Sequence, residues 1–341
     1  MVSIKRYLSL NFTKSFLMVF LPFFIIISLI YLVKISSLTT QISLSPKELL
    51  MLYSYSIPEI IYYTIPISFV ASLTSVLSRL STDNELVAIF SLGMSSKSIV
   101  SNLEKIAFLF TVLLLCISFF AIPISKQYYK SFKEHKKTQA KLNIIPGELG
   151  QKFGNYYIYI EDVQPDTKNL KNIVIYNKSD KNNEEFFAAK EGKLKHQKNT
   201  TILELIDGYG YTYKKNNLQE AKYKTINVYK NIDQKIFNFK DIYSYWIGIY
   251  TNQKLLHKAL FMFFVSFIPL ISTYLIASFS IINPRYQKNH TFLTIFVTTI
   301  TLYTIATILH KHGNLYIVFG IIFSIIVTGR YLFNKRVERF F

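Results

Sequence analysis

The sequence lacks the motifs by which most enzymes and nucleotide-driven proteins are recognised. It contains no G-x-x-x-x-G-K-[ST] loop for a nucleotide, and the glycine-bearing segment GELGQKFG (147–154) does not have that spacing. It has no H-E-x-x-H or G-x-S-x-G motif and no cysteine–histidine arrangement. His310 and His312 lie two residues apart without metal-ligand spacing. We therefore expect a chain that is not an enzyme and binds no cofactor or metal.

Cysteine is nearly absent and acidic residues are scarce. The single cysteine, Cys116, excludes an intramolecular disulfide. Twenty Asp and Glu stand against 39 Lys and Arg, which gives a net charge of +19. A strongly basic chain can indicate nucleic-acid binding. The positions of the basic residues point instead to membrane flanks, so no nucleic-acid partner is expected.

Long apolar runs without charge are abundant. The six runs are 16–33, 60–78, 106–124, 259–282, 291–309 and 313–329. Each is near the roughly 20 residues with which a helix crosses a bilayer, and backbone groups in lipid must be bonded within helices. One such run could be a buried core helix of a soluble protein, but six argue against that. The runs predict an α-helical membrane protein with six transmembrane helices, three on each side of a long insert.

The arginines indicate the orientation of these helices. All six lie in segments that this topology places on one side: Arg6, Arg79, Arg285, Arg330, Arg336 and Arg339. Cytoplasmic flanks of membrane helices collect Lys and Arg, so both termini are predicted to be cytoplasmic. Five lysines that follow the third run oppose this topology: Lys126, Lys130, Lys133, Lys136 and Lys137. Long translocated domains obey the rule weakly, which leaves the prediction in place.

The insert, residues 126–255, differs in character from the runs around it. It has many lysines, no arginine, and short alternating segments such as NYYIYIEDV (155–163) and TTILELIDGYGYTYK (200–214), which favour strands. We predict an all-β domain, a sandwich, jelly roll or open barrel, between helical domains at 1–125 and 256–341. Five of its aromatic residues could line a ligand trough or fill a core, and we favour the core. They are Tyr157, Tyr159, Phe186, Tyr209 and Tyr211.

The stretch DNELVAIFSLGMSSKSIV (83–100) lies between two runs but is too polar to cross a membrane. On a helix, Leu86, Val87, Phe90 and Met94 approach one face. Asp83 or Asn84 can cap the helix start, where its dipole favours Glu85, and Gly93 interrupts the helix near its end. A surface helix on a membrane usually has a cationic polar face. This stretch therefore predicts a short amphipathic helix that fits a groove on another protein.

The segment ELVAIFSLGMS (85–95) resembles the coupling-helix signature of the LptF/LptG family of lipopolysaccharide export permeases. IPEIIYYTIPIS (57–68) resembles the start of the family's second helix, and SIINPR (280–285) the exit of its fourth. A basic residue, Lys34, ends the first run, and YYIYIEDV with LKNIVIYN resembles a strand pair of the family's β domain. The resemblance spans nearly the whole chain but does not decide between the two paralogues.

The resemblance implies a function and its partners. A permease of this family pairs with its LptF/LptG paralogue around a membrane cavity in the bacterial inner membrane, above an LptB-type ATPase dimer. The cavity takes lipopolysaccharide and passes it to periplasmic jelly-roll-like β domains that include an LptC-type protein. Glu85, Leu86, Phe90, Gly93 and Met94 would then form the ATPase-coupling site, with a helix at about 83–100. Lys34 would contact a lipid phosphate, unless it only anchors its helix at the interface.

Two other functions remain open from the residues alone. The chain could be a scaffold or signalling protein of the membrane whose periplasmic β domain binds a partner. It could also be an enzyme acting on lipid, although the predicted helix cores contain almost no ionisable groups that would support such chemistry. An ATPase that co-purifies with the chain would favour the transporter over the scaffold, and a catalytic pair converging on the cavity would favour the enzyme.

Overall fold

A computed structural model gives the arrangement of the chain. It describes residues 4–39, 44–140, 146–153, 156–164, 169–180, 183–197, 200–214, 217–231, 238–284, 288 and 290–339. The predicted sites at 34 and 83–100 fall within these ranges. Arg285, which the orientation argument used, lies outside the described residues.

Six helical segments of the described residues are long and apolar enough to cross a membrane, which confirms the predicted arrangement. Three precede the insert: α1 (Ile4–Ser36), α2 (Pro46–Thr82), and a third built from α4 (Ser96–Cys116), η1 (Ile117–Ala121) and α5 (Ile122–Ala140). Three follow it: α7 (Gln253–Ser280), α8 (Thr291–His312), and α9 (Leu315–Phe333) continued by η2 (Asn334–Glu338). Two short helices lie between them, α3 (Glu85–Ser91) and α6 (Ile242–Ile247).

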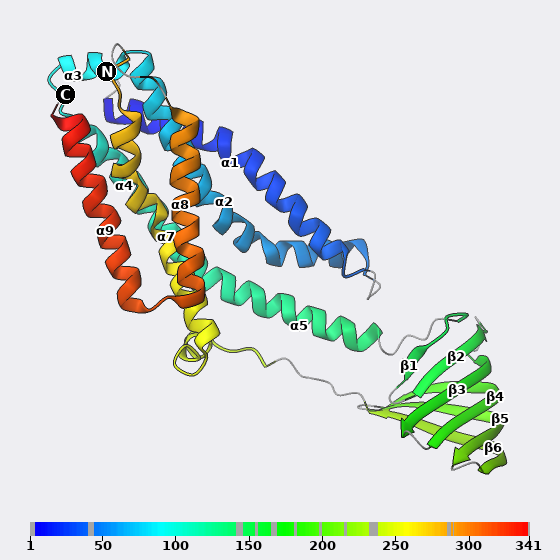
Figure 1. Cartoon of the computed structure of the whole chain (residues 1–341). Coiled ribbons are helices and arrows are strands. Elements are labelled where there is room, and N and C mark those ends of the chain that lie inside the picture. Colours follow the sequence, from blue (N-terminus) through cyan, green and yellow to red (C-terminus); the bar gives the residue numbers. More distant parts are fainter. Residues whose placement is uncertain are drawn as a thin grey trace. The chain divides into compact units, whose positions relative to one another are not determined.

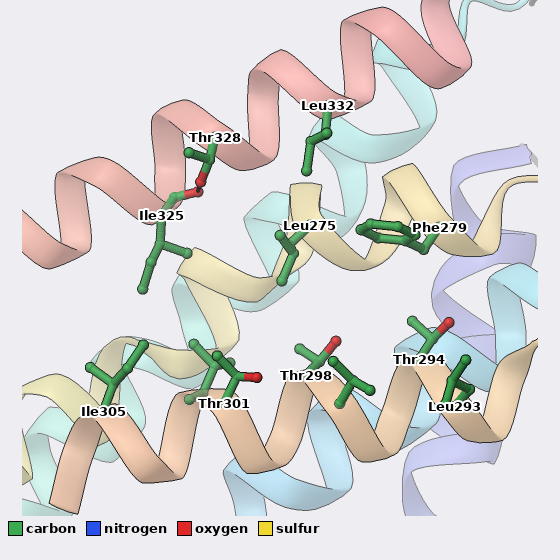
Figure 2. A pocket seen from close by; sticks show the side chains of 12 residues that line it. Leu275, Phe279, Leu293, Thr294, Thr298, Thr301, Ile305, Ile325, Thr328 and Leu332 are labelled. Carbon is green, nitrogen blue, oxygen red and sulfur yellow. Dashed lines mark hydrogen bonds between the residues drawn. The ribbon is translucent and has the colours of Figure 1, made fainter. Parts of the chain in front are cut away.

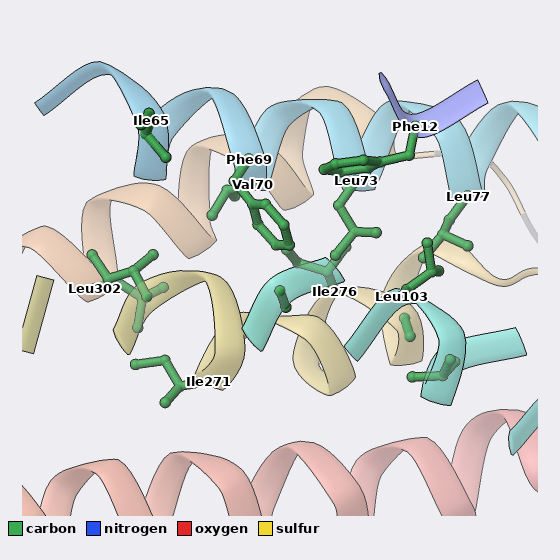
Figure 3. Close-up of a cluster of buried hydrophobic side chains, with 14 of the residues drawn as sticks. Phe12, Ile65, Phe69, Val70, Leu73, Leu77, Leu103, Ile271, Ile276 and Leu302 are labelled. Carbon is green, nitrogen blue, oxygen red and sulfur yellow. The ribbon is translucent and has the colours of Figure 1, made fainter. Parts of the chain in front are cut away.

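Helices α2 and α7 form the centre of the bundle, and most of their apolar residues are buried. Phe69 of α2 packs 5.2 Å from the ring of Phe12 in α1, within the cluster drawn in Figure 3. Buried polar contacts add to this packing: Tyr62 Oη donates to the carbonyl of Met262 at 2.8 Å. Without water, hydrogen bonds and close packing are what hold membrane helices together. The Tyr62–Met262 contact joins the two halves of the sequence in one bundle.

Helix α9 lies close to α7 at Gly329. A Cβ atom there would stand 3.2 Å from the backbone nitrogen of Leu275 and 3.4 Å from Cβ of Tyr274, whereas nothing lies within 4 Å of a Cβ at Gly320 on the same helix. Small residues let membrane helices approach in this way.

We therefore expect Gly329→Leu to destabilise the bundle by about 1–3 kcal/mol, the usual cost of overpacking. Gly320→Leu changes the same helix by the same side chain in open space and is the matched control. Thermal unfolding of both variants in detergent measures the difference. Equal unfolding temperatures for the two would show that α9 does not depend on this contact.

The insert folds as one antiparallel sheet in sequence order. Its strands are β1 (Gln151–Phe153), β2 (Tyr156–Val163), β3 (Leu170–Asp180), β4 (Asn183–Gln197), β5 (Thr200–Lys214) and β6 (Asn217–Asn231). The prediction of an all-β insert is confirmed. The described topology is simpler than a jelly roll, which requires Greek-key crossings. Each strand pairs instead with its neighbour in the sequence, because short connections join consecutive strands.

One face of the sheet forms an apolar core from alternating positions. Ile158 and Ile160 of β2, Ile173 and Ile175 of β3, and Leu203 of β5 are nearly inaccessible to solvent. Tyr223 of β6 pairs with Gly208 of β5, where a Cβ would collide with the tyrosine ring. Its hydroxyl donates to the Ala188 carbonyl at 3.1 Å, and burial raises the pKa of Tyr223 to about 12. Strand alternation therefore fixes which side chains fill this core.

The chain divides into two compact units. One comprises Met1–Leu38, Ser45–Tyr129 and Phe239–Phe341, and the other Thr39–Leu44 and Lys130–Asn238. The expected insert began at residue 126, but α5 extends the third membrane helix as far as Ala140 before the first strand. Helix-forming residues such as Lys, Gln and Glu continue past the apolar run, so the helix does not stop where the apolar residues end.

Candidate functional site

Helix α3 joins α2 to α4 at the end of the bundle where α1 begins and α9 ends (Figure 1). Two left-handed residues bound it: Asn84 has φ +58° and Gly93 has φ +87°. Gly93 closes the helix, and its N–H donates to the Phe90 carbonyl at 2.9 Å. No atom of the described residues lies within 4 Å of a Cβ built at Gly93, so close packing does not require glycine there. The left-handed backbone conformation, which glycine adopts without strain, is the reason for it.

The start of α3 differs from the capping that the sequence suggests. Asn84 is the N-cap residue but makes no side-chain cap hydrogen bond, and Asp83 is the C-cap of α2. The predicted helix at about 83–100 is also divided. The residues from Ser96 onward form the first turns of α4, where Ser95 is the N-cap. The coupling element is therefore a seven-residue helix with a sharp turn on each side.

Glu85 is tied to the first helix of the chain. The hydroxyl of Tyr7 in α1 donates to Glu85 Oε2 at 2.6 Å, across 78 residues of sequence. The carboxylate lies in the first turn of α3, where the helix dipole favours negative charge. Hydrogen bonds to a charged acceptor are stronger than neutral ones. This bond joins the start of α3 to α1.

The apolar face of α3 packs onto the chain's own bundle. Leu86 is 1% exposed, Ile89 is buried, and Phe90 and Met94 are half-buried against the same core cluster. The sequence assigned Leu86, Phe90 and Met94 to a partner's groove. Leu86 lies instead in this chain's own core, because the side of α3 that carries it packs against the apolar residues of the bundle. Val87 turns away from this face, since successive residues are 100° apart on a helix.

The outward side of α3 carries a different apolar surface. Leu92 is 78% exposed, and Val87 and Ser91 are also exposed. We call Val87, Ser91 and Leu92 the outer face of α3. An exposed apolar surface on a short helix that packs on its own bundle by the other side can enter a groove of another protein. Sequence reasoning missed Leu92 because it does not follow the spacing of the inward residues.

Charged residues of α4, α9 and η2 pair with one another at the end of the bundle that carries α3. Lys97 of α4 pairs with Glu338 of η2 at 2.5 Å. Arg330 of α9 contacts Glu104 of α4 at 3.4 Å, and Tyr274 of α7 donates to the same glutamate at 3.2 Å. Surface ion pairs contribute little stability individually. Their arrangement connects α4, α7 and α9 at the end of the bundle that carries α3. The sequence showed these charges at helix ends but not their pairing.

Lys34 lies at the other end of α1, exposed, with Nζ 5.5 Å from the centre of the Tyr31 ring. The structure therefore places it away from the α3 site, as the sequence predicted from the position of the first run. Thr40 and Gln41, which follow it, lie outside the described residues. Near the same end, Lys126 pairs with Glu59 of α2 at 2.5 Å. This ion pair neutralises one of the lysines that opposed the predicted orientation.

The second face of the sheet carries a row of aromatic residues. Strand register places Tyr157, Tyr176, Phe186 and Tyr211 opposite one another on four successive strands. Phe186 and Tyr211 lie 6.3 Å apart, and Tyr157, Phe186 and Tyr209 are each about 40% exposed. The sequence favoured the core for Tyr157, Phe186 and Tyr209 and was wrong about them, because the isoleucines fill the other face. Tyr159 and Tyr211, which were also assigned to the core, are half-buried. The row is a candidate surface for an apolar ligand or a second β domain.

Within the described ranges, no group of three or more His, Cys, Asp or Glu residues is placed to hold a metal. His310 lies against Phe261, with ring centres 5.5 Å apart.

Comparison with protein families identifies a matching family. The family described as lipopolysaccharide export system permease LptF/LptG matches residues 6–245, from the start of α1 to α6. No curated protein matches the sequence. The matched range contains α3, Lys34 and the whole β insert.

Proposed function

This chain belongs to the LptF/LptG family of lipopolysaccharide export permeases, and we propose that it is one transmembrane subunit of an ABC transporter that extracts lipopolysaccharide from the inner membrane. One observation supports the mechanism above others. A short helix between two membrane spans is held to the chain's own bundle and exposes an apolar face beside a carboxylate. A subunit without a nucleotide-binding loop uses such an element to receive motion from a separate ATPase.

The coupling site consists of Glu85 and the outer face of α3. Glu85 sets the register on an ATPase of the LptB type, and Leu92 with Val87 supplies the buried apolar area. Phe90 and Met94 contribute the parts of their side chains that remain accessible. Leu86 and Gly93 support the helix from within. A push on α3 then reaches α1 through Tyr7 and reaches α9 and η2 through α4.

The described arginines support an orientation with α3 in the cytoplasm. Arg79 hydrogen-bonds Asn11 near the start of α1, and Arg330 contacts Glu104 near the start of α4. Arg336 lies in η2, close to the C-terminus. These residues gather at the end of the bundle that carries α3, as the positive-inside rule requires of a cytoplasmic end. Both termini then lie in the cytoplasm and the β domain in the periplasm.

The lipid path begins at α1. Most of the middle of this helix is exposed in the isolated chain. Four of its side chains are more than half accessible to solvent: Met18, Ile25, Ile30 and Val33. Paired with the LptF/LptG paralogue, this face lines one wall of a membrane cavity for acyl chains. Lys34 at its outer end meets a phosphate of the lipid headgroup as a point charge. Closure of the cavity by the ATPase pushes the lipid outward.

The β domain continues the path in the periplasm. Strand β6 is an edge of the described sheet, 15 residues long, and carries lysines at Lys222 and Lys224. An open edge is a template for pairing with a further strand. The sheet can therefore extend into the next β domain of a bridge that includes an LptC-type protein. Either the aromatic row or this continued sheet then receives the lipid.

Depletion of the chain in its host tests the function. We expect newly made lipopolysaccharide to accumulate in the inner membrane, measured by pulse labelling and membrane separation, while phospholipid synthesis continues. An ATPase should co-purify with the chain from undepleted cells. Normal arrival of lipopolysaccharide at the outer membrane after depletion, with no paralogue replacing the chain, would contradict the proposal.

A further inference from the structure

An apolar groove lies between α8 and α9, with α7 as its floor (Figure 2). Both helices pack on α7, but the contact between α8 and α9 themselves is slight. The groove has a volume of about 380 Å³. We define the α8–α9 groove by six of its residues: Leu275 and Phe279 from α7, Leu293 and Thr301 from α8, and Ile325 and Leu332 from α9. The mouth of the groove is formed by Leu293, Phe279 and Leu332. It lies at the end of the bundle that carries α3, because α8 begins and α9 ends there.

The lining suits a hydrocarbon chain. The lining consists of leucine, isoleucine, valine and phenylalanine side chains, and its only other residues are threonines. The hydroxyls of Thr294 and Thr328 bond to carbonyls of their own helices, at 3.1 Å to His290 and 2.8 Å to Ser324. The hydroxyls of these two threonines are therefore already hydrogen-bonded within their own helices. A polar ligand would find few partners there.

The dimensions favour a lipid chain over a protein helix. From Leu293 to Ile305 the groove follows α8 for roughly 18 Å at 1.5 Å per residue. That length is close to one leaflet, about half of the ~30 Å hydrocarbon core. A helix of that length and about 10 Å diameter occupies on the order of 1,400 Å³, more than the whole empty space of the groove, about 910 Å³ with its open side included. An extended acyl chain is the occupant that fits.

A cation stands at the mouth. The guanidinium of Arg336 in η2 lies 4.5 Å from the ring centre of Phe279, which lines the groove. The Arg336 side chain is exposed, and no carboxylate of the described ranges forms a salt bridge with it. Arg330, one turn and a half earlier, is by contrast engaged by Glu104. Arginine binds phosphate through two parallel hydrogen bonds, and basic pockets between helices on the cytoplasmic side bind anionic lipid headgroups.

We propose that the α8–α9 groove binds one anionic glycerophospholipid, with an acyl chain along α8 and its phosphate on Arg336. The lipid fills the space between two helices that barely touch, and so braces α9 against α8. It is not the exported lipid, because its headgroup lies at the end of the bundle opposite Lys34. The assignment to the cytoplasmic leaflet rests on the orientation proposed above; the binding itself does not.

Native mass spectrometry of the full chain in detergent tests the site, with phosphatidylglycerol and phosphatidylcholine as probes. We expect one phosphatidylglycerol to bind in preference to phosphatidylcholine. Arg336→Gln should weaken phosphatidylglycerol binding about tenfold, as expected for the loss of a charge-assisted hydrogen bond. Arg339→Gln removes the same charge three residues further on and should leave binding unchanged. Thr301→Phe fills the groove and should reduce binding of both lipids, whereas Thr304→Phe, on another side of α8, should not.

Unfolding temperatures measured without added lipid identify any variant that misfolds, and Arg336→Gln tests the site independently of Thr301→Phe. Equal binding of the two lipids, or full binding by the Arg336→Gln variant, would overturn the headgroup site. Full binding by the folded Thr301→Phe variant would overturn the groove as the seat of the acyl chain. Lipopolysaccharide release is measured separately on the same variants. Absence of release by the wild-type chain with its ATPase, together with intact phosphatidylglycerol binding, would count against the transport proposal and not against this site.

Discussion

Replacing Glu85 with lysine should detach the ATPase from this subunit. The carboxylate accepts a 2.6 Å hydrogen bond from Tyr7, which a lysine cannot accept. The reversed charge also faces whatever cation the ATPase groove presents to Glu85. Losing one partner of a desolvated charge pair costs about 2–5 kcal/mol, so the dissociation constant should rise about 30-fold or more.

Affinity capture of the purified ATPase by wild-type and variant chains measures this loss directly. Asp83→Lys makes the same charge change two residues away, at an exposed position, and should leave binding within a few-fold. Tyr7→Phe removes only the hydroxyl donor and should give a smaller loss than Glu85→Lys, because the carboxylate remains. Undiminished ATPase binding by the Glu85→Lys variant would remove this residue from the interface.

The two faces of α3 should respond oppositely to truncation. Leu86→Ala empties a buried position and should cost about 2–5 kcal/mol of stability, as in other cores. Leu92→Ala removes a side chain that is 78% exposed. It should leave the unfolding temperature of the isolated chain unchanged but weaken ATPase binding about tenfold, the order expected for one buried leucine at ~25 cal/mol per Å².

Thermal unfolding and ATPase capture, run on both variants, separate these effects. The variants are matched in chemistry and differ only in the side of the helix they occupy. If Leu92→Ala lowered the unfolding temperature while Leu86→Ala lowered only affinity, the inward and outward faces of α3 would have been exchanged. That outcome would restore the assignment that the sequence alone suggested.

The large elements of the fold were predictable because each has a strong local signal. Charge-free runs of membrane length specify helices wherever they occur, and alternating Tyr and Ile segments specify strands. It was harder to predict which side of α3 packs against the bundle. Its apolar residues, Leu86, Val87, Ile89, Phe90 and Leu92, surround most of a short helix, so no single face is marked. Only contact with the bundle selects the inward side.

Two kinds of information were not readable from a single sequence. Strand β2 alternates isoleucine with tyrosine, so both faces are apolar and neither is marked as the core. The smaller branched side chains fill the interior, and the aromatic row lies outside. Pairs such as Tyr7–Glu85 and Lys97–Glu338 join distant segments. Nothing local in the sequence indicates which charged residue pairs with which, so the links from α3 to α1 and from α4 to η2 emerged only in the fold.

The proposed function requires α3 to face the cytoplasm, and cysteine accessibility tests this most directly. In a Cys116→Ser background the chain has no other cysteine, so Leu92→Cys and Lys34→Cys each provide a single thiol. A membrane-impermeant maleimide applied to intact spheroplasts should label the cysteine at position 34 at once. It should label the cysteine at position 92 only after the inner membrane is broken. Labelling of position 92 in intact spheroplasts would place α3 in the periplasm, beyond the reach of any ATPase, and would contradict the proposed function.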